Sequence, residues 1–207
     1  RGAIDSLRTG RAARAIRYAA DNGARVINWS GFVSDRSSAS RDTLRSAIRY
    51  AGDHNVLIVV GAGNDALNLD DDSNAVYPQT LDEPNLLRVA QIALDGKLYR
   101  YQTGGRWRGS NYSKKWVELA APGENFTTSL RNRESTYEVS NGTSNAAPVV
   151  TGVAALVLSI RPDLSATELK QVLVESGTPN RQLEGKIKSG RIVNPVTALQ
   201  YARDHKN

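Results

Sequence analysis

A serine at the start of a helix built of small residues is the feature of this sequence best suited to chemistry. Ser144 follows the turn Asn141-Gly142-Thr143 and precedes a run rich in alanine and valine that continues to Ile160. The first backbone N–H groups of a helix have no partner within it, and the helix dipole favours negative charge there. An alkoxide or a developing oxyanion would be stabilised at this point, so the pattern predicts a nucleophilic hydroxyl that a bound peptide can approach closely.

Asn64 is the second candidate, because it follows the most strand-like run of the chain. Residues 56–60 read Val-Leu-Ile-Val-Val, and a Gly-Ala-Gly turn leads from them to Asn64. Open α/β sheets place their sites beyond the carboxyl ends of strands. Acyl transfer passes through a tetrahedral oxyanion, which needs a nucleophile and two hydrogen-bond donors about 3 Å from one carbonyl. Ser144 offers its hydroxyl and its own N–H, and Asn64 offers a side-chain amide, so we predict both as catalytic residues.

These motifs resemble those of the subtilisin-like serine proteases, in that family's own order. The resemblance spans roughly residues 9 to 201, and the stretch Asn-Gly-Thr-Ser-Asn-Ala-Ala-Pro is by far its most specific part. The segments that carry it are 26–31, 59–65, 109–113 with 119–123, and 141–148. The resemblance implies a three-layer α/β/α fold with a mainly parallel sheet, and a serine endopeptidase that acts on polypeptides through an acyl-enzyme.

The resemblance also implies a substrate groove. Ser30, Gly31 and Phe32 would align an extended peptide, and Gly61, Ala62 and Gly63 would wall the pocket for the residue before the scissile bond. Asp65 would lie near the mouth of that pocket, where a carboxylate could favour lysine or arginine. A solvated loop residue is an equally acceptable interpretation of Asp65.

The catalytic base is where the sequence departs from the family. Subtilisins carry Asp, then His, then Ser along the chain, whereas the histidines of this sequence are His54 and His205. His205 stands among the last three residues, and His54 precedes the strand whose far end delivers Asn64, about 20 Å away at roughly 3.3 Å per strand residue. We therefore expect residues 1–207 to be one catalytic domain that lacks its N-terminal third, with Asp and His on a segment before residue 1, cleaved away or on another chain.

Two other classes of function remain open. A subtilase-like module without a base would serve as a non-catalytic, peptide-binding or regulatory partner. Residues 61–66 also match the dinucleotide fingerprint G-x-G-x-x-A, although a polar loop rather than a helix is expected to follow.

The loop after Asn64 shows part of a calcium-binding pattern. Asp70, Asp72 and Asn74 copy the first three ligands of a calcium loop, but Ala75 and Leu81 stand where such a loop has Gly and Glu. A solvated acidic loop is favoured there, with a structural calcium site as the alternative and no cofactor required for the chemistry.

The elements that must position these residues follow from their hydrophobic patterns. Helical and strand-like segments alternate in the first half, which predicts an α/β fold with a mainly parallel sheet. The expected helices are 9–22, 40–53, 143–160, 165–175 and 194–203, and the expected strands are 24–29, 56–60, 86–94, 116–120 and 136–139. We expect helix 143–160 to be buried on all sides, and residues 99–112 to form an irregular exposed loop.

Composition limits the partners and the compartment. The 207 residues are 40% hydrophobic and 23% charged, enough for one ordinary core, and the absence of cysteine excludes disulfides and thiolate sites. The net charge of +6 is partly an arginine stripe at residues 8, 11, 14 and 17, which we interpret as a solvated helix face, so no nucleic-acid partner is expected. No membrane partner is expected either, whereas a propeptide or inhibitor and secretion out of the cell follow from the resemblance alone.

Overall fold

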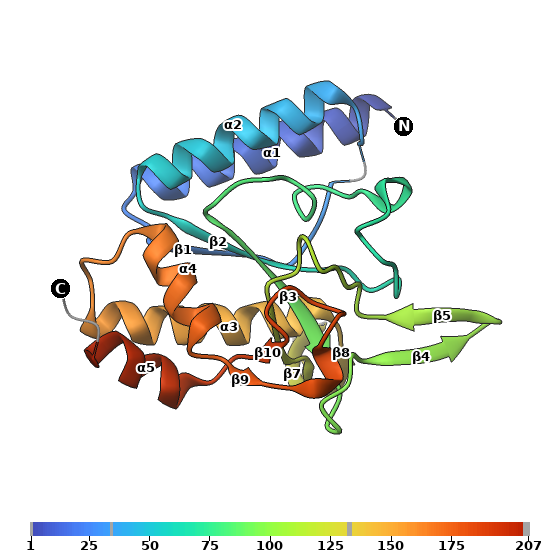
Figure 1. Cartoon of the computed structure of the whole chain (residues 1–207). Helices are drawn as coiled ribbons and strands as arrows, with labels where there is room; N and C mark the ends of the chain where they lie inside the picture. Colours follow the sequence, from blue (N-terminus) through green and yellow to red (C-terminus); the bar gives the residue numbers. More distant parts are fainter. Residues whose placement is uncertain (1, 34, 132–133, 205–207) are drawn as a thin grey trace.

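The computed structural model describes residues 2–33, 35–131 and 134–204. These residues form five helices, two short 3-10 turns and ten strands (Figure 1). The helices and turns are α1 (Gly2–Asp21), α2 (Ser38–Asp53), η1 (Asp72–Asn74), α3 (Thr143–Ile160), α4 (Ala166–Glu175), η2 (Arg181–Leu183) and α5 (Pro195–Asp204). The strands are β1 (Val26–Trp29), β2 (Leu57–Gly61), β3 (Leu86–Ile92), β4 (Arg100–Thr103), β5 (Arg106–Gly109), β6 (Leu119–Pro122), β7 (Glu124–Arg131), β8 (Glu134–Asn141), β9 (Thr178–Pro179) and β10 (Arg191–Ile192).

Within the described residues the main sheet has six strands, in the order β1-β2-β3-β6-β10-β9. All neighbours are parallel except β9, which runs antiparallel to β10. Trp29 at the end of β1 lies beside Val60 of β2, and Gly61 lies beside Val89 of β3. Because parallel strands share their carboxyl edge, the segments after β1 and β2 leave the sheet side by side, and the predicted site residues are brought to one edge.

The side chains of β2 point alternately into two hydrophobic cores, one on each face of the sheet. Ile58 and Val60 pack with the helices α1 and α2 on one face, whereas Leu57 and Val59 pack with α3, α4 and α5 on the other. All of β2 and β3 is buried, as expected for central parallel strands covered on both faces. Figure 1 shows the helices on either side of the sheet, and the predicted α/β fold with a mainly parallel sheet is confirmed.

The helix α3 has the predicted bounds, but one side of it is exposed. Its buried side packs against β1, β2, β3 and β6 and against α4 and α5, which accounts for its apolar composition. Ser144, Pro148, Gly152, Ala155 and Leu156 are exposed, with Leu156 49% accessible. The prediction of burial on all sides is therefore wrong, because none of the described segments covers this side. The same helix is the single one in the described residues that is long and apolar enough to cross a membrane by length and composition.

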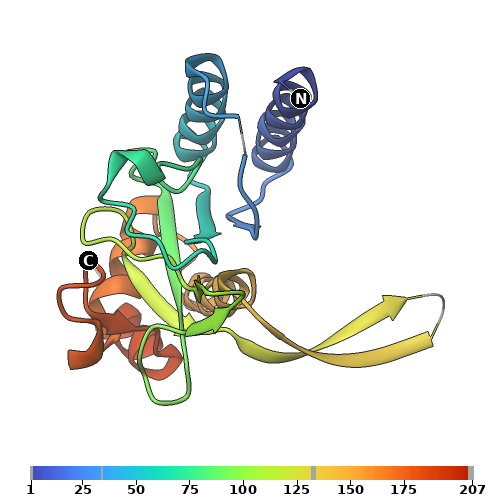
Figure 2. The ribbon, with the colours of Figure 1, turned by 90° about the vertical axis from the view of Figure 1, so that its right-hand side faces the viewer.

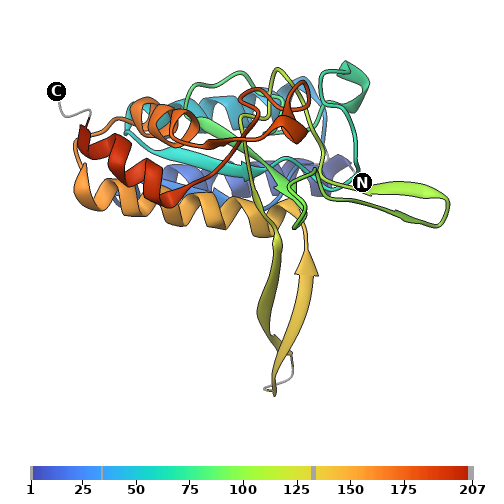
Figure 3. The same cartoon turned by 60° about the horizontal axis from the view of Figure 1, so that its bottom comes forward.

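Two hairpins also differ from the sequence prediction. Residues 99–112, expected as an irregular loop, contain the antiparallel pair β4–β5, in which Tyr101 lies beside Arg108. The expected short strand 136–139 is part of β8, which pairs along its whole length with β7 in a hairpin that extends away from the sheet (Figures 2 and 3). Hydrophobic periodicity did not indicate the hairpin β4–β5, because its strands are exposed except at Gly109 and so have no buried face.

The other predicted elements are found, with one large shift and several small ones. The helix α1 begins at Gly2 rather than Thr9, and α4 starts at the predicted capping box, in which Ser165 and Glu168 bond reciprocally. Arg8, Arg11 and Arg14 are exposed on α1, as expected for a solvated face. The start of α1 lies seven residues before the predicted one, whereas the ends of the other helices and of the main-sheet strands that were predicted shift by three residues or fewer.

Candidate active site

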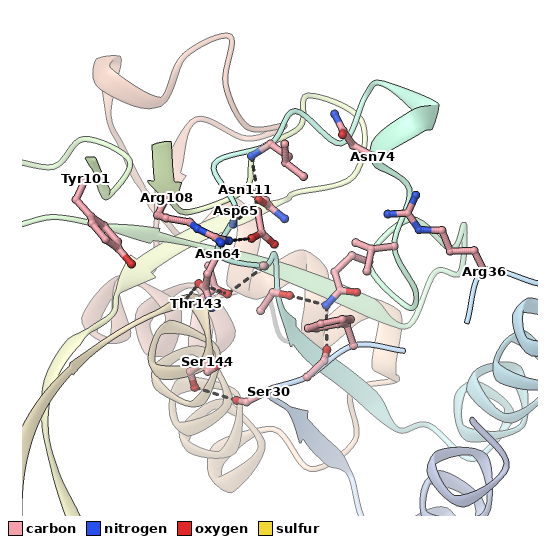
Figure 4. A pocket seen from close by; sticks show the side chains of 17 residues that line it. Ser30, Arg36, Asn64, Asp65, Asn74, Tyr101, Arg108, Asn111, Thr143 and Ser144 are labelled. Atoms are coloured by element: carbon pink, nitrogen blue, oxygen red, sulfur yellow. Dashed lines mark hydrogen bonds and ion pairs between the residues drawn. The ribbon is translucent and has the colours of Figure 1, made fainter. Parts of the chain in front are cut away.

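Ser144 is the second residue of α3 and is exposed at the carboxyl edge of the sheet (Figure 4). The helix is capped by Gly142, whose carbonyl accepts from the backbone N–H groups of Asn145 at 3.0 Å and Ala146 at 3.3 Å. The N–H of Ser144 belongs to the first turn, where helical N–H groups lack partners within the helix. The hydroxyl of Ser144 and its own N–H are thus presented at the positive end of an 18-residue helix.

Asn64 lies beside Ser144, and Thr143 fixes its side chain. Asn64 Oδ1 accepts a hydrogen bond of 2.8 Å from the backbone N–H of Thr143 and one of 3.1 Å from Thr143 Oγ1. The hydroxyl in turn accepts from the backbone N–H of Gly63 at 3.0 Å. With its oxygen engaged in this way, the Asn64 amide is left with its Nδ2 hydrogens to donate to a ligand.

Glycines create the space between these groups. A Cβ on Gly61 would lie 2.8 Å from the carbonyl oxygen of Thr143, so only glycine lets the end of β2 approach α3 this closely. A Cβ on Gly142 would lie 3.5 Å from Asn64 Nδ2 and 3.7 Å from the backbone N of Ser144. The absence of a side chain at Gly142 therefore keeps free the space that both donors border.

The segment after β1 completes one wall of the site. Ser30 Oγ donates to the carbonyl oxygen of Ser144 at 2.8 Å. Gln79 Nε2 donates both to the carbonyl of Gly31 at 3.0 Å and to that of Gly61 at 2.8 Å, and so joins the segment after β1 to the end of β2. Phe32 is 63% exposed next to them. The segment 30–32 is thus fixed beside the nucleophile, with its outermost side chain open to solvent.

A cavity of about 500 Å³ opens between these segments. Of the residues predicted from sequence it is lined by Ser30, Gly31, Phe32, Gly61, Gly63, Asn64, Asp65 and Ser144. Ala62 does not line it, because its side chain is fully buried against the cluster that contains Leu69 and Ala90. A pocket of this size beside a hydroxyl and two donors can hold the side chain of a peptide whose carbonyl is attacked.

The sequence profile of the Subtilase family matches residues 4–192 of this chain. The chain belongs to the Subtilase family. It is 32% identical over 186 residues to a component of the subtilase cytotoxin of Escherichia coli, in an alignment that covers 84% of this chain and 53% of that protein. It is 29% identical over 202 residues to subtilisin-like protease 3 of Plasmodium falciparum (isolate 3D7), covering 91% of this chain and 25% of that one.

Solved structures agree with this membership. A structure of the subtilase cytotoxin assembly has a TM-score of 0.73 at 28% identity and covers 93% of this chain and 65% of its own. A lanthipeptide protease has a TM-score of 0.76 at 24% identity, with 93% and 66% covered, a likeness that concerns the fold. This subtilase chain thus spans about half the length of the Escherichia coli relative and about two thirds of these two structures.

The described residues place no histidine at the Ser144 hydroxyl of this subtilase chain. His54 is the cap residue at the end of α2, and its Nδ1 atom lies 2.8 Å from the carbonyl oxygen of Tyr50. The interpretation of His54 as a helix-end residue agrees with this position. His205 lies outside the described residues.

The loop that carries Asn64 is shaped by Asn111, a residue that the sequence did not single out. Asn111 Oδ1 accepts from the backbone N–H groups of Asp65 at 3.1 Å and Leu67 at 2.9 Å, and its Nδ2 donates to the carbonyl of Ala62 at 3.0 Å. Gly63 has φ +104° and passes so close that a Cβ would lie 2.4 Å from Asn111 Nδ2. The residues after Gly61 therefore form a loop wrapped around one buried amide.

This loop excludes the dinucleotide interpretation of residues 61–66. That fingerprint requires a helix directly after the glycines, whereas the next helical residues begin at Asp72 and Ala66 has a positive φ of 55°. Thr143, Gln79 and Asn111 were missed as site residues because each acts on residues far away in sequence. The available signals were that Thr143 directly precedes the nucleophile and that Asn111 lies in segment 109–113, which carries part of the resemblance.

In the acidic loop that resembles a calcium site, the carboxylate at the first ligand position, Asp70, already accepts hydrogen bonds from other groups of the protein. Asp70 accepts from Ser113 Oγ at 2.6 Å and from the backbone N–H groups of Lys114 and Lys115 at 3.0 and 3.1 Å. Burial raises the pKa of Asp70, but these hydrogen bonds outweigh it and leave the pKa lowered. Across the described part of the chain, no three or more His, Cys, Asp or Glu side chains are grouped to hold a metal.

Proposed function

We propose that this chain carries the nucleophile and the oxyanion hole of a subtilisin-like serine endopeptidase that cleaves extended polypeptide segments. The observation that most supports this proposal is the double hydrogen bond from Thr143 to Asn64 Oδ1. It holds an amide donor beside the exposed Ser144 at a helix N-terminus, which is the arrangement that acyl transfer requires.

In the proposed reaction the Ser144 oxygen attacks the scissile carbonyl while a histidine takes the hydroxyl proton. The carbonyl oxygen becomes negative and is held by Asn64 Nδ2 and the N–H of Ser144. The C–N bond then breaks, the histidine passes its proton to the leaving amine, and an acyl ester remains on Ser144. Water hydrolyses this ester by the same route, which releases a carboxylic acid and restores the hydroxyl.

The histidine, and an aspartate that orients it, would come from a segment outside residues 1–207, either the N-terminal part of the same protease or a separate chain. Two uncovered surfaces support this part of the proposal. Within the described residues β1 pairs on one side, with β2, and the exposed side of α3 carries Ser144. Because α3 packs against β1, a segment that covers both surfaces could deliver a histidine to Ser144.

A polypeptide substrate would lie along the segment 30–32, and the side chain before the scissile bond would enter the cavity bounded by Gly61, Gly63 and Asp65. The exposed Phe32 and the fixed backbone of Gly31 suit an extended peptide that adds a strand at this edge. A protease that binds its substrate in this extended form would cut unfolded segments of a protein rather than its folded parts.

The test of this function is covalent labelling of the protein that includes the completing segment. A fluorophosphonate modifies only an activated serine, so we expect one label, on Ser144, and none on Ser144→Ala. Ser159→Ala, a hydroxyl on the same helix, is the matched control and should label like the wild type. Absence of label in the intact protein, or equal labelling of Ser144→Ala, contradicts the mechanism.

The second candidate is a non-catalytic, peptide-binding or regulatory module, because no described histidine reaches Ser144. The sequence that precedes residue 1 distinguishes the two. A histidine motif and a strand-end aspartate there support the enzyme, and their absence supports the module, in which peptides bind but fluorophosphonate labelling fails.

Three further expectations remain proposals. Secretion from the cell predicts that the protein accumulates in the medium of the cells that make it. A propeptide or inhibitor would occupy the groove at residues 30–32 and compete with the substrate. A structural calcium ion would raise the melting temperature on addition of calcium, and Asp70→Asn would remove that effect.

A further inference from the structure

The hairpin β4–β5 reaches the mouth of the cavity beside Ser144. Tyr101 and Arg108 of this hairpin line the cavity together with Asp65 (Figure 4). Arg108 forms an ion pair with Asp65, a residue 43 positions away in sequence. The charge predicted to attract a basic substrate side chain is thus already paired with a side chain of this chain.

The backbone around this ion pair is anchored on both sides of Asp65. The N–H of Gly109 donates to the carbonyl of Asn64 at 3.1 Å, and the N–H of Ala66 donates to the carbonyl of Gly109 at 2.8 Å. Gly109 has φ +128°, and a Cβ there would lie 2.1 Å from the carbonyl oxygen of Tyr99. Arg108 is therefore presented to Asp65 by the end of strand β5, which these hydrogen bonds hold in place, and not by a free loop.

The charged side chains that line the cavity have a net positive charge. They are Arg36, Asp65 and Arg108, and the remaining lining residues are uncharged. Arg36 Nη1 donates to the carbonyl of Ser73 at 3.0 Å, so its charge is not cancelled by that contact. With Asp65 paired to Arg108, the net contribution of these three groups is +1.

We infer that Arg108 is a specificity-determining residue, which masks Asp65 and makes the cavity select an uncharged or acidic side chain over lysine or arginine. This inference rests on the proposed function and reverses the preference that Asp65 alone would give. A basic side chain entering the cavity would have to displace Arg108 from Asp65 and would meet Arg36 as a like charge. An uncharged side chain meets neither cost and contacts the apolar wall of Phe32 and Val76.

The inference is tested with peptides that differ only in the residue before the scissile bond, lysine or leucine, cleaved by the intact protease. We expect Arg108→Gln to raise the lysine-to-leucine ratio of kcat/KM roughly tenfold, since Asp65 and Arg108 are both about half exposed and their charges partly screened. Arg108→Lys keeps the charge and should keep the wild-type ratio. Asp65→Asn added to Arg108→Gln should abolish the gain.

Arg106→Gln is the matched control, because it removes the same charge from the same strand and Arg106 does not line the cavity. An equal change of the ratio in Arg106→Gln, or no change in Arg108→Gln, overturns the inference. An equal change in Arg106→Gln would indicate that the overall positive charge of the hairpin sets the preference. No change in Arg108→Gln would mean that Arg108 does not mask Asp65.

A binding measurement separates this inference from the catalytic proposal. Benzamidine is a rigid cationic probe and benzyl alcohol an uncharged one, and their affinities can be measured by calorimetry with the intact Ser144→Ala protein. We expect Arg108→Gln to strengthen benzamidine binding roughly tenfold relative to benzyl alcohol. This shift together with failed fluorophosphonate labelling contradicts the proposed function alone, whereas successful labelling without this shift contradicts the inference alone.

Discussion

The backbone N–H of Thr143 donates a 2.8 Å hydrogen bond to Asn64 Oδ1, so the residue before the nucleophile orients the amide beside it. The two residues are 79 positions apart and come from the start of α3 and from the loop that follows β2. This bond couples the two halves of the proposed oxyanion hole. If α3 shifted relative to the sheet, the helix N–H and the Asn64 amide would both be misplaced.

Asn64→Ala should lower kcat by about 100- to 1,000-fold, the loss measured when one oxyanion-hole donor is removed from a subtilisin, and should leave KM nearly unchanged. The reason is that Asn64 Nδ2 is expected to bind the oxygen only after it becomes negative. Steady-state kinetics on a peptide substrate measure both constants. Asn68→Ala, in the same loop, is the control, and a KM effect as large as the kcat effect would contradict this role.

Thr143→Val should reduce kcat roughly five- to tenfold, because the lost hydroxyl bond that orients Asn64 is worth about 1 kcal/mol and about 1.4 kcal/mol is tenfold in rate. The variant keeps the backbone bond to Asn64 but loses the hydroxyl bond, and it leaves the N–H of Gly63 without its acceptor. Thr143→Ser restores the hydroxyl and should restore kcat. If the serine variant is as slow as the valine variant, Thr143 acts through packing and not through its hydroxyl.

Gly142→Ala should lower kcat by up to about 100-fold, the effect of misplacing reacting groups by about 1 Å. The new methyl group would contact both Asn64 Nδ2 and the backbone N of Ser144, where the substrate oxygen is expected. The backbone at Gly142 is extended, with φ 164°, so the fold itself should tolerate alanine. We expect an unchanged melting temperature together with a lower kcat. If the melting temperature falls along with kcat, the variant has a folding defect instead.

Glu168→Gln should make the stability of the protein less dependent on pH in acid. The side chain and then the backbone N–H of Ser165 hydrogen-bond the Glu168 carboxylate and lower its pKa. A lowered pKa means that this contribution is present above the unfolded value of about 4.3 and is lost as the pH falls through the folded value. Melting temperatures measured from neutral pH down to about pH 2 should therefore converge for wild type and Glu168→Gln. Glu184→Gln serves as the control outside the capping box. If the melting temperatures of wild type and Glu168→Gln fall in parallel with pH, the capping box does not cause the pH dependence.

Local patterns in the sequence were sufficient for much of the fold. The bounds of α3, the capping box at Ser165 and the central strands follow from propensity and hydrophobic period, which are properties of neighbouring residues. The hairpin β4–β5 was missed because its strands are exposed except at Gly109 and so leave no such pattern, and β7–β8 forms a two-stranded sheet of its own, separate from the main sheet.

The sequence by itself determined the chemistry that is available: a serine at a helix start, an asparagine after a strand, and no histidine motif to serve as base. Only the tertiary structure decided how these groups are held. The bond from Thr143 to Asn64, the bridge that Gln79 makes between Gly31 and Gly61, and the masking of Asp65 by Arg108 each join residues from separate elements. Such contacts depend on where the parallel strands end and how closely glycines let segments approach, and these distances exist only in the folded chain.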